Sequence, residues 1–188
     1  MLHLNRLLHL FGLALMLLLS GCTALPTAQP GAGGNAVFSL GIKNIGSQPF
    51  NYSAYALRIR DRNTGQEFSI NTFSNLSRER CEKTGRLEDD YCLQVHTLHL
   101  TPGDYEVTGY RIWADWGMWS FDYKTKEPWN HNFKIVKGAT VYLGSYVLMY
   151  KGEPDDRRGS DMLPTYVQLD NKMTSDLATA EKLGNQGI

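Results

Sequence analysis

Eight of the chain's 21 aromatic residues lie in the 24 residues from 110 to 133. Aromatic rings that are exposed beside carboxylates and amides can stack on sugar rings or contact a protein partner. Trp113 and Trp116 flank Asp115 in a stretch that the sequence predicts to be a loop. The alternative is core packing, which the period-two spacing of the aromatics in 119–123 favours. The candidate ligand-binding residues are Trp113, Asp115, Trp116 and Trp129.

Residues that could support catalysis or bind metal are sparse. The sequence contains no GxSxG, P-loop or HExxH motif. His96 and His99 are three residues apart on a predicted strand, so regular pleating places them on opposite faces. No third ligand follows at a spacing typical of zinc sites. We therefore expect a non-enzymatic protein without a metal or other cofactor.

The first 21 residues are typical of an export signal. Arg6 precedes an unbroken apolar run over residues 10–19. Such a run is too short to span a bilayer, which takes about 20 apolar residues, but it suits the apolar region of a secretory signal. Residues 19–22, Leu-Ser-Gly-Cys, resemble the lipobox of bacterial lipoproteins. This resemblance implies lipidation of the Cys22 thiol, cleavage before Cys22 and acylation of the new amino group; the alternative is an ordinary secreted protein with a chance cysteine.

Lipidation at Cys22 makes a membrane the first expected partner, because two or more acyl chains anchor a protein stably. Thr23 and Ala24 follow, and the resemblance to Gram-negative lipoproteins without Asp after the cysteine implies the outer membrane. The expected orientation is toward the periplasm, and surface exposure stays open. Residues 22–34 are rich in Pro and Gly, which predicts a flexible tether with a reach of about 20 Å.

Two cysteines remain once Cys22 carries lipid. An exported domain with one remaining pair favours a disulfide between Cys81 and Cys92. The alternative is a redox pair, but the CxxC spacing typical of that chemistry is absent. Closing a loop of about twelve residues is expected to stabilise the fold by roughly 3 kcal/mol.

The composition favours one folded domain. Lys plus Arg number 19 and Asp plus Glu number 19, so the net charge is zero, which argues against a nucleic-acid partner. Hydrophobic residues make up 42% of the chain, which argues against a disordered protein. Short period-two runs separated by turn residues predict an all-β fold over residues 35–170, a single antiparallel β-sandwich of the Ig- or transthyretin-like type. Residues 171–188 are expected to form a short C-terminal helix and tail.

The pattern also predicts local features of this domain. Residues 54–71 are expected to form a hairpin, and residues 71–90 a long loop. The apolar phase slips between Leu93 and Leu100, which predicts a bulge near His96 and Thr97. Residues 101–104, Thr-Pro-Gly-Asp, suit a type II turn with positive φ at Gly103, which would pair the strands on either side.

Two of these segments carry a second resemblance. Residues 100–107 (LTPGDYEV), and residues 133–138 (FKIVKG) followed by 141–144 (VYLG), resemble uncharacterised bacterial lipoproteins with a small prealbumin-like or carboxypeptidase-regulatory-like domain. The resemblance covers roughly residues 37–169. It implies a fold and a class of envelope lipoprotein, and no catalytic residues.

These observations predict a membrane-anchored lipoprotein with a binding or assembly role in the cell envelope. The first alternative is a glycan-binding module that uses the Trp-rich stretch. The second is an accessory lipoprotein of a secretion apparatus, and an enzyme comes third. The expected partners are thus a membrane and either an envelope protein or a glycan.

Overall fold

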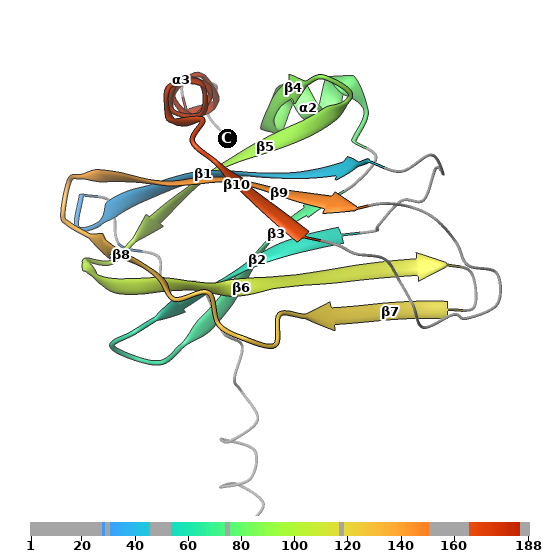
Figure 1. Ribbon diagram of the computed structural model, residues 1–188. Coiled ribbons are helices and arrows are strands. Elements are labelled where there is room, and N and C mark those ends of the chain that lie inside the picture. Colours follow the sequence, from blue (N-terminus) through green and yellow to red (C-terminus); the bar gives the residue numbers. More distant parts are fainter. Residues whose placement is uncertain are drawn as a thin grey trace, which may run out of the picture.

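The computed structural model describes residues 28, 31–45, 54–73, 76–116, 119–150 and 166–184. In this part of the chain the fold is mostly β, which confirms the predicted class. Two five-stranded sheets lie one above the other, and two helices lie beyond one of them (Figure 1). The export signal, Cys22 and most of the predicted tether lie outside the described residues.

The first sheet has the strand order β10-β9-β1-β5-β4. Its central strand β1 pairs antiparallel with β5 and parallel with β9, so the expectation of purely antiparallel strands is wrong here. The physical reason is the path of the chain, which visits the second sheet twice between β1 and β9 and on its last return places β9 beside β1 in the same direction. The strands are β1 (Gly34–Asn44), β4 (Gly85–Glu88), β5 (Tyr91–Leu100), β9 (Thr140–Tyr150) and β10 (Tyr166–Asp170).

The second sheet has the order β3-β2-β6-β7, with β8 also paired to β6, and all of its pairs are antiparallel. The predicted hairpin is confirmed, because β2 and β3 pair from Ala54 with Phe73 to Arg60 with Glu67. The turn between them closes with a hydrogen bond from the Gly65 amide to the Asp61 carbonyl at 2.8 Å. The strands are β2 (Ala54–Asp61), β3 (Glu67–Phe73), β6 (Gly103–Trp116), β7 (Trp119–Lys124) and β8 (His131–Ile135).

One apolar cluster fills the space between the sheets. Alternate residues of each strand enter it, as period-two patterning requires. Phe38 and Leu40 of β1 face Leu57 and Ile59 of β2 in this cluster, and none of the four is exposed to solvent. Tyr105 and Phe133 add a stacked pair with ring centroids 5.5 Å apart.

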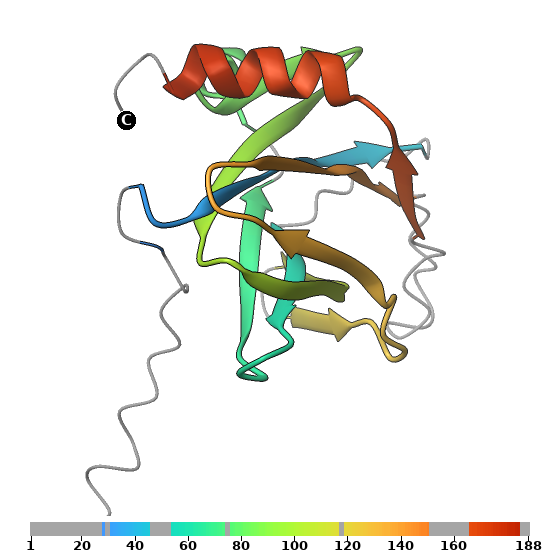
Figure 2. The same cartoon turned by 90° about the vertical axis from the view of Figure 1, so that its left-hand side faces the viewer.

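A second, smaller cluster covers the other face of the first sheet. Helix α3 (Met173–Gly184) lies across this face, away from the second sheet (Figure 2). Leu183 of α3 packs there with Val37 and Val95. The C-terminal helix predicted from the sequence is therefore confirmed.

This arrangement explains the phase slip in β5 without a bulge. The register between β1 and β5 is unbroken from Gly34 with Leu100 to Gly41 with Leu93, so the predicted bulge is wrong. Val95 packs in the cluster beneath α3, whereas Leu98 and Leu100 belong to the core between the sheets. Both faces of β5 are covered, so apolar residues of either parity are buried.

Residues 71–90, predicted to be a long loop, contain the end of β3, helix α2 and strand β4. Helix α2 (Arg78–Thr84) begins after Ser77, whose hydroxyl accepts a hydrogen bond from the Arg80 amide. This segment is short of apolar residues because a covalent bond holds it. Cys81 of α2 and Cys92 of β5 form a disulfide with their Cα atoms 5.7 Å apart, as predicted.

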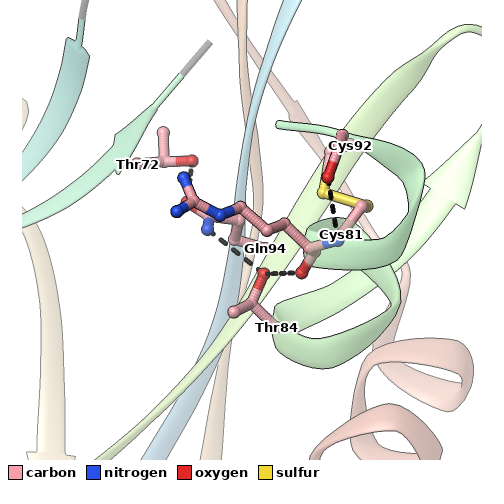
Figure 3. Close-up of a disulfide and its surroundings, with 7 residues drawn as sticks. Thr72, Cys81, Thr84, Cys92 and Gln94 are labelled. Atoms are coloured by element: carbon pink, nitrogen blue, oxygen red, sulfur yellow. Dashed lines mark hydrogen bonds between the residues drawn. A yellow bond between two sulfur atoms is a disulfide. The ribbon is translucent and has the colours of Figure 1, made fainter. Parts of the chain in front are cut away.

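A buried glutamine ties the same helix to the second sheet. Gln94 of β5 accepts a hydrogen bond from the Thr72 hydroxyl of β3, and its amide donates to the Thr84 hydroxyl of α2 at 3.3 Å. Figure 3 shows this chain of bonds beside the disulfide between Cys81 and Cys92. Polar residues of the supposed loop therefore link the two sheets.

The segment 101–104 is not a hairpin turn. β5 belongs to the first sheet and β6 to the second, so the strands on either side do not pair with each other. Gly103 has no positive φ and instead begins β6, opposite Ile135 of β8. The Tyr105 hydroxyl donates to the Thr101 carbonyl at 3.0 Å. Pro and Gly mark a crossing between sheets here, and the predicted type II turn is wrong.

A buried carboxylate fixes α3 to the first sheet. Asp176 has no exposed surface and accepts hydrogen bonds from the Ser39 hydroxyl at 2.8 Å and the Tyr142 hydroxyl at 2.7 Å. Its other oxygen pairs with the Arg86 guanidinium at 2.9 Å. Arg86 also pairs with Glu88. Such a group is tolerated in the interior only when its oxygens are satisfied, as they are here.

Candidate functional site

The Trp-rich stretch is a hairpin and not a loop. β6 continues through Trp116, and β7 begins at Trp119, with the two tryptophans paired. Trp113 and Asp115 therefore lie on a strand, which corrects the loop predicted for them. The backbone positions of Asp115 and Trp116 are described, whereas their side chains lie outside the described part of the chain. Of the four candidate residues, the structure thus describes the side chains of Trp113 and Trp129.

Trp113 lies on the outer face of the second sheet. Its strand neighbour Ile112 enters the core, so alternation turns Trp113 outward. The Arg111 guanidinium lies over the indole, 4.2 Å from the ring centroid. The same guanidinium donates to both carboxylate oxygens of Asp122, at 2.7 and 2.5 Å. This bidentate pair raises the pKa of Arg111 and lowers that of Asp122. It also holds the planar guanidinium of Arg111 over the Trp113 indole.

A second aromatic residue shares this face. Ala54 of β2 pairs with Phe73 of β3 on one side and with Trp113 of β6 on the other. Phe73 is 54% exposed. The two rings thus belong to one row across the sheet, and two strand spacings place their Cα atoms about 10 Å apart. Phe73 was not among the predicted site residues, because residues 71–90 were expected to form a loop.

Trp129 lies elsewhere, between the two sheets. Its ring contacts Tyr110 with centroids 5.4 Å apart and lies nearly parallel to Tyr146, at 6.1 Å and 7°. Its backbone amide donates to the Thr108 carbonyl of β6 at 3.2 Å. Because Tyr110 and Trp113 point to opposite faces of β6, the structure does not bring Trp113 and Trp129 together. The single site predicted from the sequence is therefore divided.

A glycine fixes the segment that carries Trp129. Gly109 has φ +146° and lies at a register shift between β2 and β6. A Cβ on Gly109 would lie 2.6 Å from the Thr125 hydroxyl, so a larger residue would push this segment away. Thr125 in turn accepts a hydrogen bond from the Tyr110 amide at 2.7 Å. This anchor directs the chain after β7 along β6 to Trp129.

Trp129 lines a pocket of about 290 Å³ at the open edge between the sheets. Tyr146 of β9 is almost completely buried and forms the floor, whereas Leu169 of β10 is 53% exposed and forms part of the rim. The volume is close to the lower limit of ligand pockets, which is about 300 Å³. Five side chains line the pocket: Trp129, His131, Tyr146, Val167 and Leu169.

Hydrogen bonds order the polar side of this pocket. The Tyr146 hydroxyl donates to the Leu143 carbonyl at 3.0 Å and lies 2.8 Å from Nδ1 of His131. Burial, and to a lesser extent Tyr142, raises the pKa of Tyr146 well above its ordinary value, so its hydroxyl keeps its proton. The alternation of side chains along β8 and β9 does not reveal from the sequence that His131 and Tyr146 contact each other. Of the five residues that line this pocket, only Trp129 was predicted from the sequence as a candidate binding residue.

The other two histidines in the described part of the chain, His96 and His99, behave as structural residues. His96 stacks on Phe38 with ring centroids 5.4 Å apart, and burial lowers its pKa to about 4. His99 has the opposite strand parity and hydrogen bonds through Nδ1 with Asn35 at 3.0 Å. Within the described ranges, no three His, Cys, Asp or Glu side chains are grouped so that they could hold a metal ion. No helix in the same ranges is long and apolar enough to cross a membrane.

Comparison with known proteins gives little beyond this geometry. No known protein family and no curated protein matches the sequence. Among solved structures, the chain is similar to a leucine-rich repeat protein from Bacteroides thetaiotaomicron, at 11% identity and a TM-score of 0.34. The similarity covers 68% of this chain and 15% of that one. A likeness of this extent supports no argument about fold or function.

Proposed function

We propose that this protein is a non-enzymatic lipoprotein of the cell envelope that binds a small ligand in the pocket at Trp129. In this proposal Cys22 carries the lipid, the outer membrane holds the protein, and the two sheets form one β-sandwich domain that faces the periplasm. The proposed placement rests on the lipobox resemblance of residues 19–22. The pocket lined by Trp129, His131 and Tyr146 is the observation that supports binding.

Binding fits the chemistry of this pocket better than catalysis does. Its lining is largely apolar and aromatic, with one imidazole, which is typical of ligand pockets. A nucleophile with an adjacent base would be required for acyl transfer. Among the five lining side chains, His131 could act as a base, but it is paired with a tyrosine whose pKa is raised, and such a phenol is a poor nucleophile.

Native mass spectrometry tests the proposed binding. Full-length protein, extracted in detergent and incubated with the small-molecule fraction of envelopes from its source cells, should retain a bound compound. Trp129→Ala should lose that compound, and so should Leu169→Asp, whose half-exposed site tolerates a charge without unfolding. Trp113→Ala, on the far face, should keep it. Absence of any bound compound, or equal retention by all variants, would contradict this function.

Glycan binding is the second candidate, and the row formed by Phe73, Ala54 and Trp113 favours it. An exposed ring such as that of Phe73, with the partly buried Trp113 in the same row, can stack on the apolar face of a sugar. Two ion pairs lie on the same face of the sheet, Arg58 with Glu67 and Arg111 with Asp122.

Pull-down on insoluble cellulose, chitin and peptidoglycan tests this candidate. Phe73→Ala and Trp113→Ala should each weaken retention. Tyr166→Ala is the matched control, because Tyr166 is an aromatic residue of similar exposure, 51%, on the first sheet. Equal retention of all three variants would contradict glycan binding at this row.

A further inference from the structure

We infer that the pocket at Trp129 selects a compact, uncharged ring ligand that donates a hydrogen bond to Nε2 of His131. This inference rests on the proposed binding function and names the ligand chemistry of the same pocket. It is carried by the hydrogen bonds of Tyr146, the identity of the five lining side chains and the pocket volume.

The hydrogen bonds of Tyr146 determine the tautomer of His131. The hydroxyl group of a tyrosine has one hydrogen to donate, and a carbonyl oxygen can only accept a hydrogen bond. The contact of 3.0 Å with the Leu143 carbonyl therefore uses the Tyr146 hydrogen. At the second contact, of 2.8 Å, the Tyr146 oxygen must accept, so Nδ1 of His131 carries the hydrogen and donates it.

A neutral imidazole has one hydrogen on its two ring nitrogens. With that hydrogen on Nδ1, Nε2 of His131 is an acceptor. A ligand that lies in the pocket and reaches Nε2 must therefore bring a hydroxyl or N–H group. An ether or a carbonyl at the same position would leave Nε2 without a donor, which is unfavourable where water is displaced.

The other lining residues restrict charge and size. Trp129, Tyr146, Val167 and Leu169 offer ring faces and methyl groups, and none of the five lining residues is a carboxylate, lysine or arginine. A charged group in such a lining would lose its water without gaining an ionic partner. A volume of about 290 Å³ suits one ring with a short substituent.

Phenol and its methyl ether, anisole, test this inference as a matched pair of probes. Both present one aromatic ring, but only phenol can donate a hydrogen bond. Titration of the protein with each probe at pH 8, followed by tryptophan fluorescence or by NMR, gives both dissociation constants. We expect phenol to bind the wild-type protein about 3- to 10-fold more tightly than anisole, the range of one net hydrogen bond.

His131→Phe keeps a ring in place and removes Nε2, so the preference for phenol should disappear in this variant while anisole still binds. Equal affinities in the wild type, or an unchanged preference in His131→Phe, would overturn the inference and leave the pocket as a binding site. Failure of both probes to bind at millimolar concentration would overturn the pocket itself, and the ligand assignment with it.

A ¹H–¹⁵N NMR spectrum of the histidine side chains gives an independent test that needs no ligand. In the neutral imidazole of His131, the nitrogen-bound hydrogen should be on Nδ1. Tyr146→Phe should release this constraint and change the tautomer distribution. A hydrogen on Nε2 of His131 in the wild type would contradict the inference, whatever the probes do.

Discussion

The buried imidazole of His96 should make the stability of this protein fall as the pH is lowered from about 6.5 toward 4. Burial lowers the pKa of His96 to about 4 in the folded protein, whereas an exposed histidine titrates near pH 6.5. In this window the unfolded chain binds a proton that the folded chain excludes. Stability is therefore fully present above pH 6.5 and decreases as the pH falls.

The size of the effect follows from the pKa difference. One pKa unit corresponds to about 1.4 kcal/mol, so lowering the pH from 6.5 to 5 should cost the folded state about 2 kcal/mol through His96 alone. This is a large share of a typical domain's stability of about 5–15 kcal/mol. The cost arises because the ring stacks on Phe38 in the core and its Nε2 is buried without a hydrogen-bond partner among the described residues.

His96→Phe is the variant that isolates this effect. Phenylalanine keeps the ring on Phe38 and removes the buried nitrogen, so stability at pH 7.5 should be equal to or higher than that of the wild type. Urea unfolding followed by circular dichroism at pH 7.5, 6 and 5 gives the free energy of unfolding of both proteins. The difference between them should grow by about 2 kcal/mol on going to pH 5. Parallel pH profiles would refute the argument, because they would mean that His96 is not held neutral.

Three further variants test other parts of the fold. Asp176→Ala should lower the free energy of unfolding by about 3 kcal/mol, which is near the low end for a broken buried pair because Arg86 keeps Glu88 as a second partner. The control is Glu79→Ala, which removes an exposed ion pair and should cost less than about 1 kcal/mol. Similar midpoints of urea unfolding for the two variants would refute the role of Asp176. Cys81→Ser in the wild-type background should leave Cys92 open to thiol labelling after denaturation, whereas labelling of both cysteines in the unreduced wild type would contradict the bond. Partial burial alone would raise the pKa of Glu88, but hydrogen bonds from Lys172 and Arg86 outweigh this effect and lower the pKa. Glu88→Gln should therefore reduce stability at pH 7, and the stability of this variant should fall less steeply than that of the wild type below about pH 4.3. The same dependence of stability on pH in both proteins would contradict the pairing.

The fold class could be predicted because period-two patterning is a local signal. The hairpin of β2 and β3 was found in this way, and helix α3 was predicted from local helix signals in residues 174–184. The pairing of strands within each sheet could not be predicted, because the pairing of β1 with β9, for example, joins residues about 100 positions apart. The segment 101–104 shows the limit most clearly: Pro-Gly indicates a change of direction, but only the tertiary fold decides whether the chain turns back or crosses to another sheet.

Burial on both faces explains the bulge wrongly predicted in β5, and a disulfide explains why helix α2 was missed. β5 lies between the core and α3, so its apolar residues change parity without any irregularity of the backbone. Helix α2 has few apolar residues, since the disulfide from Cys81 holds it in place of a packed face. The disulfide itself was predictable by counting cysteines, although the helix that it holds was not.

The candidate site was predictable only in part for a related reason. Aromatic density drew attention to Trp113 and Trp129, but sequence spacing cannot tell on which face of a sheet a ring lies when a glycine such as Gly109 shifts the register. The partners that complete each place, Phe73 for one and Tyr146 for the other, come from distant strands. Their approach is a property of the packed sheets.

Anchoring through Cys22 is the central claim of this account, since it determines the compartment and the partners that the domain can meet. Intact-mass spectrometry of the protein extracted from the membranes of its source cells tests it most directly. Anchoring through Cys22 predicts a chain that begins at Cys22 and carries a diacylglyceryl group and an N-terminal acyl chain, with the Cys81–Cys92 bond intact. A chain that begins at another residue, or one that begins at Cys22 without lipid, would contradict it.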